Sequence, residues 1–64
     1  MMCLSTAYAV KDGNKDLIID KVASVRVEDG DIIFEDLMGR TARVPGIISY
    51  VDLLNNEIIC QRAV

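Results

Sequence analysis

The chain has 64 residues, a formal net charge of −3 and no histidine. A chain this short forms a single domain, residues 1–64, whose core is marginal unless self-association, a metal or disulfides add stability. The negative charge disfavours a nucleic-acid partner, and no run of about 18 apolar residues is present to span a bilayer. Two cysteines are too few for a disulfide scaffold and no leader peptide is evident, so we expect a cytosolic protein with reduced thiols.

In the first half of the chain, turn-forming residues separate runs of strand length. We expect a first strand over residues 4–10, followed by a turn in the polar Gly, Asn and Asp cluster at residues 11–16. The next expected strand, 22–28, alternates apolar with polar side chains, which is typical of a sheet with one buried face. Asp29-Gly30 then predicts a tight hairpin into a strand over 32–36.

In the second half, breaks at Met38-Gly39, Pro45-Gly46 and residues 54–56 predict three more strands, over 41–44, 47–51 and 58–62. A helix over residues 48–54 is the alternative, but that segment is short, rich in β-branched residues and preceded by Pro-Gly. Strands at this spacing predict an all-β fold, a small SH3-like barrel or roll. Uninterrupted apolar runs suggest that the outer face packs on a second subunit, so we expect a homodimer.

Cys3 places a thiol close to the start of a chain without histidine. Cysteine is most often a buried apolar residue, and periodicity alone favours that reading. Chain ends are usually exposed, however, and a thiol becomes a thiolate once a cation binds. A thiolate, a terminal amine and the deprotonated backbone amides of Cys3 and Leu4 form a donor set that suits square-planar Ni(II) better than tetrahedral Zn(II). The sequence therefore offers a candidate nickel site at Cys3 and Leu4.

Two segments of the chain have a familiar pattern. The start Met2-Cys3-Leu4-Ser5-Thr6 runs straight into a strand, and a Val-Pro-Gly-Ile-Ile segment with Val-Asp-Leu after it occupies residues 44–53. Together they resemble the CooT-like family of small nickel-binding proteins, and the likeness covers nearly the whole chain. The resemblance implies a small β-barrel that pairs as a homodimer, with Cys3 as nickel ligand near the paired N-termini. It also implies nickel storage, buffering or delivery to a nickel enzyme such as carbon monoxide dehydrogenase.

One departure from the family pattern concerns Met1, which stands ahead of Met2. Methionine is removed when the next residue is small, so a chain that starts at Met2 would be trimmed to leave Cys3 first. We interpret Met1 as an added residue or as a start assigned one codon early. If both methionines stay, the terminal amine is displaced from the chelate of Cys3, and the nickel affinity falls.

The other candidate site residues are more simply explained by roles in the fold than by roles in a binding site. Cys60 lies in an apolar run and is expected in the core, although a disulfide with Cys3 is possible in oxidised protein if the first and last strands are neighbours. The aromatic residues Tyr8, Phe34 and Tyr50 are expected in the core or the dimer contact. Eight carboxylates do not match a calcium loop and are expected in solvated turns: Asp12, Asp16, Asp20, Glu28, Asp29, Asp31, Glu35 and Asp36.

A row of arginines supports the alternative function, an RNA-binding β-barrel module. Arg26, Arg40, Arg43 and Arg62 could form a stripe across neighbouring strands. The stripe lacks interleaved aromatic residues and belongs to an acidic chain, so this alternative is the weaker one. No arrangement typical of an enzyme is visible, because histidine is absent and no glycine-rich phosphate loop occurs.

Overall fold

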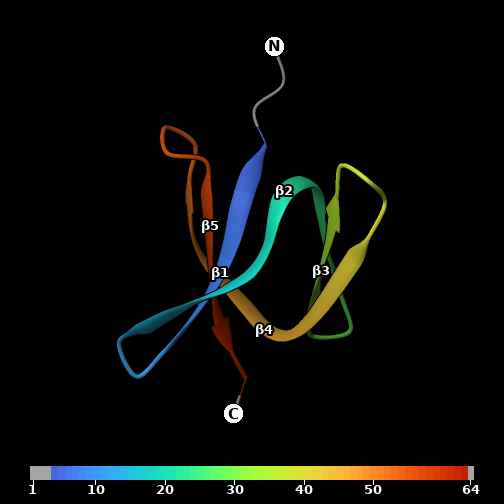
Figure 1. Cartoon of the computed structure of the whole chain (residues 1–64). Coiled ribbons are helices and arrows are strands. Elements are labelled where there is room, and N and C mark those ends of the chain that lie inside the picture. The colour runs from blue at the N-terminus through green and yellow to red at the C-terminus, as the bar shows by residue number, and fades with distance from the viewer. Residues whose placement is uncertain (1–3, 64) are drawn as a thin grey trace.

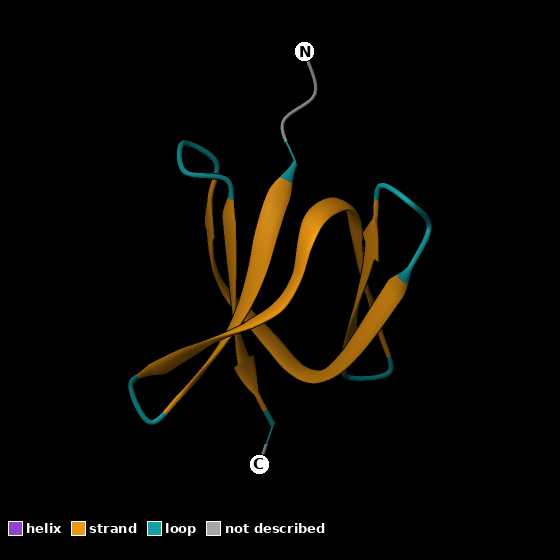
Figure 2. Ribbon diagram, viewed as in Figure 1, coloured by secondary structure: helices purple, strands orange, loops and turns teal. Residues whose placement is uncertain are grey.

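The computed structural model describes residues 4–63, which form a closed barrel of five strands (Figures 1 and 2). Consecutive strands pair antiparallel, and the barrel closes through parallel pairing of the first strand with the last. The strands are β1 (Ser5–Lys11), β2 (Asn14–Glu28), β3 (Asp31–Asp36), β4 (Thr41–Asp52) and β5 (Glu57–Arg62). The predicted all-β small barrel is confirmed.

The first correction concerns β2, which begins at Asn14 rather than at residue 22 and is 15 residues long. The turn before it needs only Asp12 and Gly13, which both have positive φ (53° and 79°), as in the tight turns that match the twist of a hairpin. The apolar run 17–19 therefore belongs to the strand. Positive φ at Lys21 (53°) and a register shift after Val22 bend the strand instead of ending it.

The second correction concerns β4, a single strand of 12 residues where two strands, 41–44 and 47–51, were predicted. Pro45 and Gly46 lie inside it and mark a bend. Gly46 has a φ of +152°, and a Cβ there would collide with the backbone carbonyl oxygen of Gln61 on β5. Glycine thus allows the strand to cross the barrel close to its neighbour. The helical alternative for 48–54 is wrong, since residues up to Asp52 are in the strand.

The core lies inside the barrel and is made of small and medium apolar side chains. Phe34, Ile32 and Cys60 are its largest fully buried members. Around them pack Ala7, Val22, Val44 and Ile58. The core positions predicted for Cys60 and Phe34 are confirmed, whereas Tyr50 is 59% exposed on β4.

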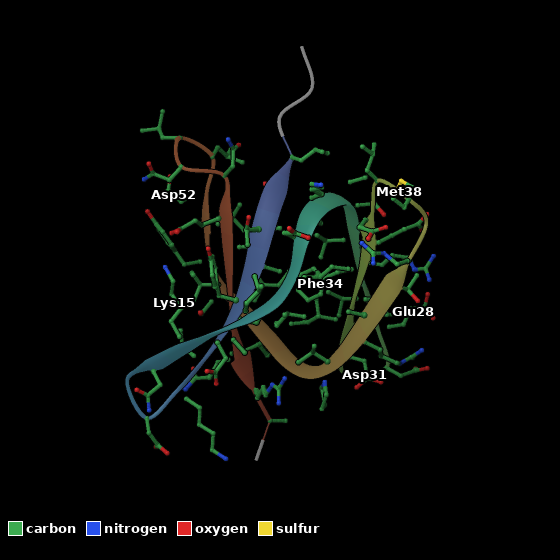
Figure 3. The ribbon with its side chains drawn as sticks, in the orientation of Figure 1. Lys15, Glu28, Asp31, Phe34, Met38 and Asp52 are labelled. Carbon is green, nitrogen blue, oxygen red and sulfur yellow. The ribbon has the colours of Figure 1, made fainter. Side chains whose placement is uncertain are left out.

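The two ends of the barrel carry different turns (Figure 1). The β3–β4 and β4–β5 turns lie at the end where β1 begins, whereas the β1–β2 and β2–β3 turns lie at the opposite end, where β5 finishes. The side chains follow the same division, since Met38 and Asp52 lie toward the first end and Asp31 toward the other (Figure 3). The start of β1 is therefore surrounded by the two turns that flank β4.

Candidate metal site at the start of β1

The predicted metal ligand Cys3 lies outside the described residues. Leu4, whose backbone amide was the second predicted ligand, is the first described residue, is half-buried and directly precedes β1. The structure therefore shows the surroundings into which the Cys3 segment leads, but it does not test the ligand set.

The start of β1 sits midway between two turns. Ser5 pairs with Val22, which in turn pairs with Asp36 at the end of β3. On the other side, Thr6 pairs with Glu57, which pairs with Asp52 at the end of β4. Neighbouring strands are about 4.8 Å apart, so each turn begins about 10 Å from the start of β1. The backbone N–H of Thr6 also donates to the carbonyl of Asn56, at 2.8 Å, and so ties β1 to the β4–β5 turn.

Asp36 holds the β3–β4 turn in one conformation. Its carboxylate accepts hydrogen bonds from the backbone N–H of Met38 (2.9 Å) and of Arg40 (2.8 Å), and from the Nε of Arg40 (2.8 Å). Burial alone would raise the pKa of Asp36, but the bonds from Arg40 and Met38 together hold that pKa below its ordinary value. Asp36 was predicted in a solvated turn. That is wrong, because this carboxylate is 3% exposed and its oxygens serve the turn.

Asp52 holds the β4–β5 turn in the same way. It accepts hydrogen bonds from the backbone N–H groups of Leu54 (3.0 Å) and Asn55 (3.1 Å), and from the Nδ2 of Asn55 (2.8 Å). The side-chain bond from Asn55 is the main reason why the pKa of Asp52 lies below its ordinary value. Each of the two turns is therefore fixed by the aspartate that precedes it.

Both fixed turns present a pair of apolar side chains to solvent. Leu37 and Met38 are 51% and 78% exposed, and Leu53 and Leu54 are 80% and 94% exposed. We call these four residues the apolar rim. The sequence contains a signal that could have found it, since both turns read Asp, Leu, a second apolar residue and then Gly or Asn. Leu54 had been considered only as part of the break at residues 54–56 or as the end of the alternative helix.

Cys60 is not an accessible ligand. It is fully buried, faces the core beside Ala9 of β1, and burial raises the pKa of its thiol. The first and last strands are neighbours as the disulfide hypothesis required, but Cys3 lies outside the described residues and the disulfide stays a prediction. Within residues 4–63, no three His, Cys, Asp or Glu side chains lie close enough together to hold a metal ion.

Three of the four arginines in the proposed RNA stripe are paired with carboxylates. Arg40 binds Asp36 at 2.8 Å, Arg43 binds Asp31 at 2.8 Å and Arg26 binds Glu28 at 3.1 Å. Arg26 and Arg43 also flank Ile33 in the sheet, and that outward-facing side chain is only 7% exposed. The charges of these three arginines are offset by neighbouring carboxylates, which does not favour binding to phosphates.

Three comparisons place the chain among known proteins. The family model described as CO dehydrogenase accessory protein CooT matches residues 2–61. A search of curated proteins found no match. A crystal structure assigned to CooT from Carboxydothermus hydrogenoformans covers 97% of this chain and 100% of that one, with a TM-score of 0.90 and 18% sequence identity. At this identity the similarity shows the fold. Residues 4–63 form no helix that is long and apolar enough to cross a membrane.

Proposed function

Because the chain belongs to the CooT family of CO dehydrogenase accessory proteins, we propose that it binds Ni(II) and stores, buffers or delivers it to a nickel enzyme such as carbon monoxide dehydrogenase. Nickel is then the cargo of the protein rather than a permanent cofactor. Within residues 4–63 the five strands close around a core of apolar side chains.

The observation that carries the proposal is the burial of Cys60. The chain has two cysteines and no histidine, so the soft ligands that nickel prefers are few. Cys60 is fully buried in the core and burial disfavours its thiolate form. Cys3 is then the one remaining thiol, and we propose it as the sulfur donor.

We infer that the donors come from one short stretch of chain. Once methionine is removed ahead of it, Cys3 offers its amine and its thiolate, and Leu4 offers its backbone amide. Backbone pairing of β1 with β2 begins at Ser5, so in the sequence the proposed donors directly precede a paired strand. Deprotonated nitrogen and sulfur donors favour a square-planar Ni(II) complex. This ligand set requires Cys3 to be the first residue.

The proposal includes a homodimer. Residues 4–63 carry ten large apolar side chains that are at least 36% exposed, and a chain of 64 residues would gain stability if a second copy covered part of that surface.

The test replaces the sulfur and leaves the barrel intact. Serine at position 3 is also small, so methionine removal is preserved in Cys3→Ser. We expect this variant to lose the thiolate-to-nickel charge-transfer absorption, while the matched variant Cys60→Ala keeps it. Retention of the band in Cys3→Ser, or its loss only in Cys60→Ala, would show that Cys3 is not the sulfur donor.

A further inference from the structure

We propose that the end of the barrel where β5 finishes carries a second binding site, a cleft that holds a small organic carboxylate between Lys11 and Arg62. All residues of this site are described, and none of them belongs to the candidate nickel site. Arg62 is the fourth arginine of the predicted RNA stripe, and within residues 4–63 it forms no ion pair with a carboxylate.

The cleft lies between the ends of β1 and β5 and the bend of β4. Figure 1 shows that β5 finishes at the end of the barrel that carries the β1–β2 turn. Volumes of about 300–1,000 Å³ are typical of small-molecule sites. The cleft measures about 420 Å³ and is lined by Val10, Lys11, Asp12, Pro45, Gln61 and Arg62.

Backbone hydrogen bonds hold the three lining segments together. Gln61 of β5 pairs with Val10 of β1 on one side and with Ile47 of β4 on the other. Beyond the end of β5, the N–H of Ala63 donates to the carbonyl of Pro45, at 2.9 Å. The cleft is therefore formed before a ligand arrives, so little conformational entropy is lost on binding.

The strand register brings the two cations together. β1 and β5 are parallel, and Val10 lies opposite Gln61. One position further, Lys11 and Arg62 are the last residues of their strands. Paired strands are about 4.8 Å apart, so the two backbones lie side by side where these residues occur.

Lys11 and Arg62 also belong to the same face of the sheet. Ala9 of β1 and Cys60 of β5 are buried inside the barrel, at 2% and 0% exposure. Side chains alternate along a strand, so Lys11 and Arg62, two residues further on, continue these two inward-facing rows. Both residues are exposed. Each row therefore ends in a positive charge at the same end of the barrel.

These two charges have no counter-charge among the described residues. Four of the seven Lys and Arg side chains form ion pairs within residues 4–63, and Lys11 and Arg62 are not among them. Like charges at neighbouring positions of a sheet are destabilising. A bound carboxylate offsets this repulsion, and a guanidinium group matches a carboxylate with two parallel N–H donors.

The other lining residues select the kind of anion. Asp12 adds a negative charge to the cleft, so its charged side chains leave one net positive charge. This favours a monocarboxylate over a phosphate group, which carries about two negative charges at neutral pH. A hollow of about 300 Å³ shares Gln61 and Arg62 with the cleft and reaches Ile47, which is 63% exposed. Apolar surface there suits a ligand with a short aliphatic body.

The test is a titration of the metal-free, nitrogen-15-labelled full chain with sodium butyrate at constant ionic strength, followed by amide chemical shifts. We expect shifts confined to residues 10–12, 45–47 and 61–63, with a Kd of about 1 mM. Acetate should bind more weakly than butyrate, by about 2- to 4-fold for each methylene removed. Inorganic phosphate should also bind more weakly than butyrate.

Glutamine substitutions test the two cations. Lys11→Gln and Arg62→Gln should each weaken butyrate binding about 10-fold or more, because each removes a charged donor. Lys21→Gln is the matched control, since it changes the net charge equally and Lys21 neither lines the cleft nor forms an ion pair within residues 4–63. This variant should bind butyrate like the wild type. Circular dichroism confirms that each variant is folded.

Three results would overturn the proposal. The first is an absence of shifts in the cleft at about 20 mM butyrate. The second is an equal affinity of wild type and Arg62→Gln, or an equal loss in Lys21→Gln, which would reflect net charge alone. The third is tighter binding of phosphate than of butyrate, which would assign the cleft to another ligand. Since the protein is metal-free in this experiment, a failure of nickel binding leaves the result unaffected.

Discussion

Replacement of Gly46 by alanine tests the bend that makes β4 one strand. The new Cβ would meet the backbone carbonyl oxygen of Gln61 and lie 3.0 Å from the Cα of Arg62, so the conflict is with backbone and cannot be relieved by a side-chain rotation. Overpacking costs about 1–3 kcal/mol, and a non-glycine residue at an unfavourable positive φ adds about 1–2 kcal/mol. We therefore expect Gly46→Ala to lose about 2–5 kcal/mol of unfolding free energy.

A loss of this size is large for such a chain. A domain of 64 residues has a free energy of unfolding of about 3–10 kcal/mol. Each kcal/mol shifts Tm by about 4–8 °C, so thermal unfolding followed by circular dichroism should show a fall of at least about 8 °C.

Gly39→Ala is the matched control for this substitution. Gly39 also has positive φ (+86°), but nothing lies within 4 Å of a Cβ added there, so only the backbone cost of about 1–2 kcal/mol applies. If the two variants unfold at the same temperature, the close approach of β4 to β5 at Gly46 is not what constrains this position.

Three further predictions concern single side chains. Asp36 has a lowered pKa in the folded chain, so the stability that its carboxylate contributes is present above its ordinary pKa of 3.8 and is lost as pH falls through the lower folded value. Asp36→Asn should reduce this loss of unfolding free energy at acid pH, measured by urea titrations at several pH values. An unchanged pH dependence in the variant would contradict the role of the carboxylate. In native protein a thiol reagent should modify Cys3 rapidly and Cys60 only as fast as the barrel unfolds, and equal rates would show that Cys60 is accessible. Phe34→Ala should lose about 3–5 kcal/mol, while the exposed Tyr50→Ala should lose much less; similar losses would mean that Phe34 does not anchor the core.

The sequence was sufficient for the fold class and for most turns. Asp29-Gly30 was predicted as a hairpin, and both residues have positive φ (50° and 79°). Cys60 was placed in the core from the apolar residues around it, and it is fully buried. These features depend on local chemistry, which a single sequence displays directly.

The boundaries of β2 and β4 could not be predicted, because the residue types that end a strand also occur where a strand only bends. Pro45-Gly46 normally terminates a strand, but here Gln61 of β5 lies so close to Gly46 that the glycine serves a tertiary approach. The bend of β2 falls on Lys21, a residue with no turn preference that adopts a φ of 53°. In both places the pairing with neighbouring strands overrides local propensity.

The sequence suggests donor groups for the candidate site but not the structure around them. Cys3 and Leu4 could be selected by donor type and position alone, and their role stays a prediction because Cys3 lies outside the described residues. The apolar rim was missed because Leu37 and Leu53 are close to the start of β1 only through pairing across the barrel. Only the register reveals that the two turns flank the same end.

Nickel binding at Cys3 is tested most directly by a nickel titration of protein whose mass shows Cys3 as its first residue, followed by ultraviolet absorption and equilibrium dialysis. We predict a saturable thiolate-to-nickel band that is clearly weakened in the same protein when Met2 is retained. Dialysis that leaves the trimmed protein free of nickel would contradict the proposed site. An affinity that is unchanged by retention of Met2 would exclude the terminal amine as a ligand.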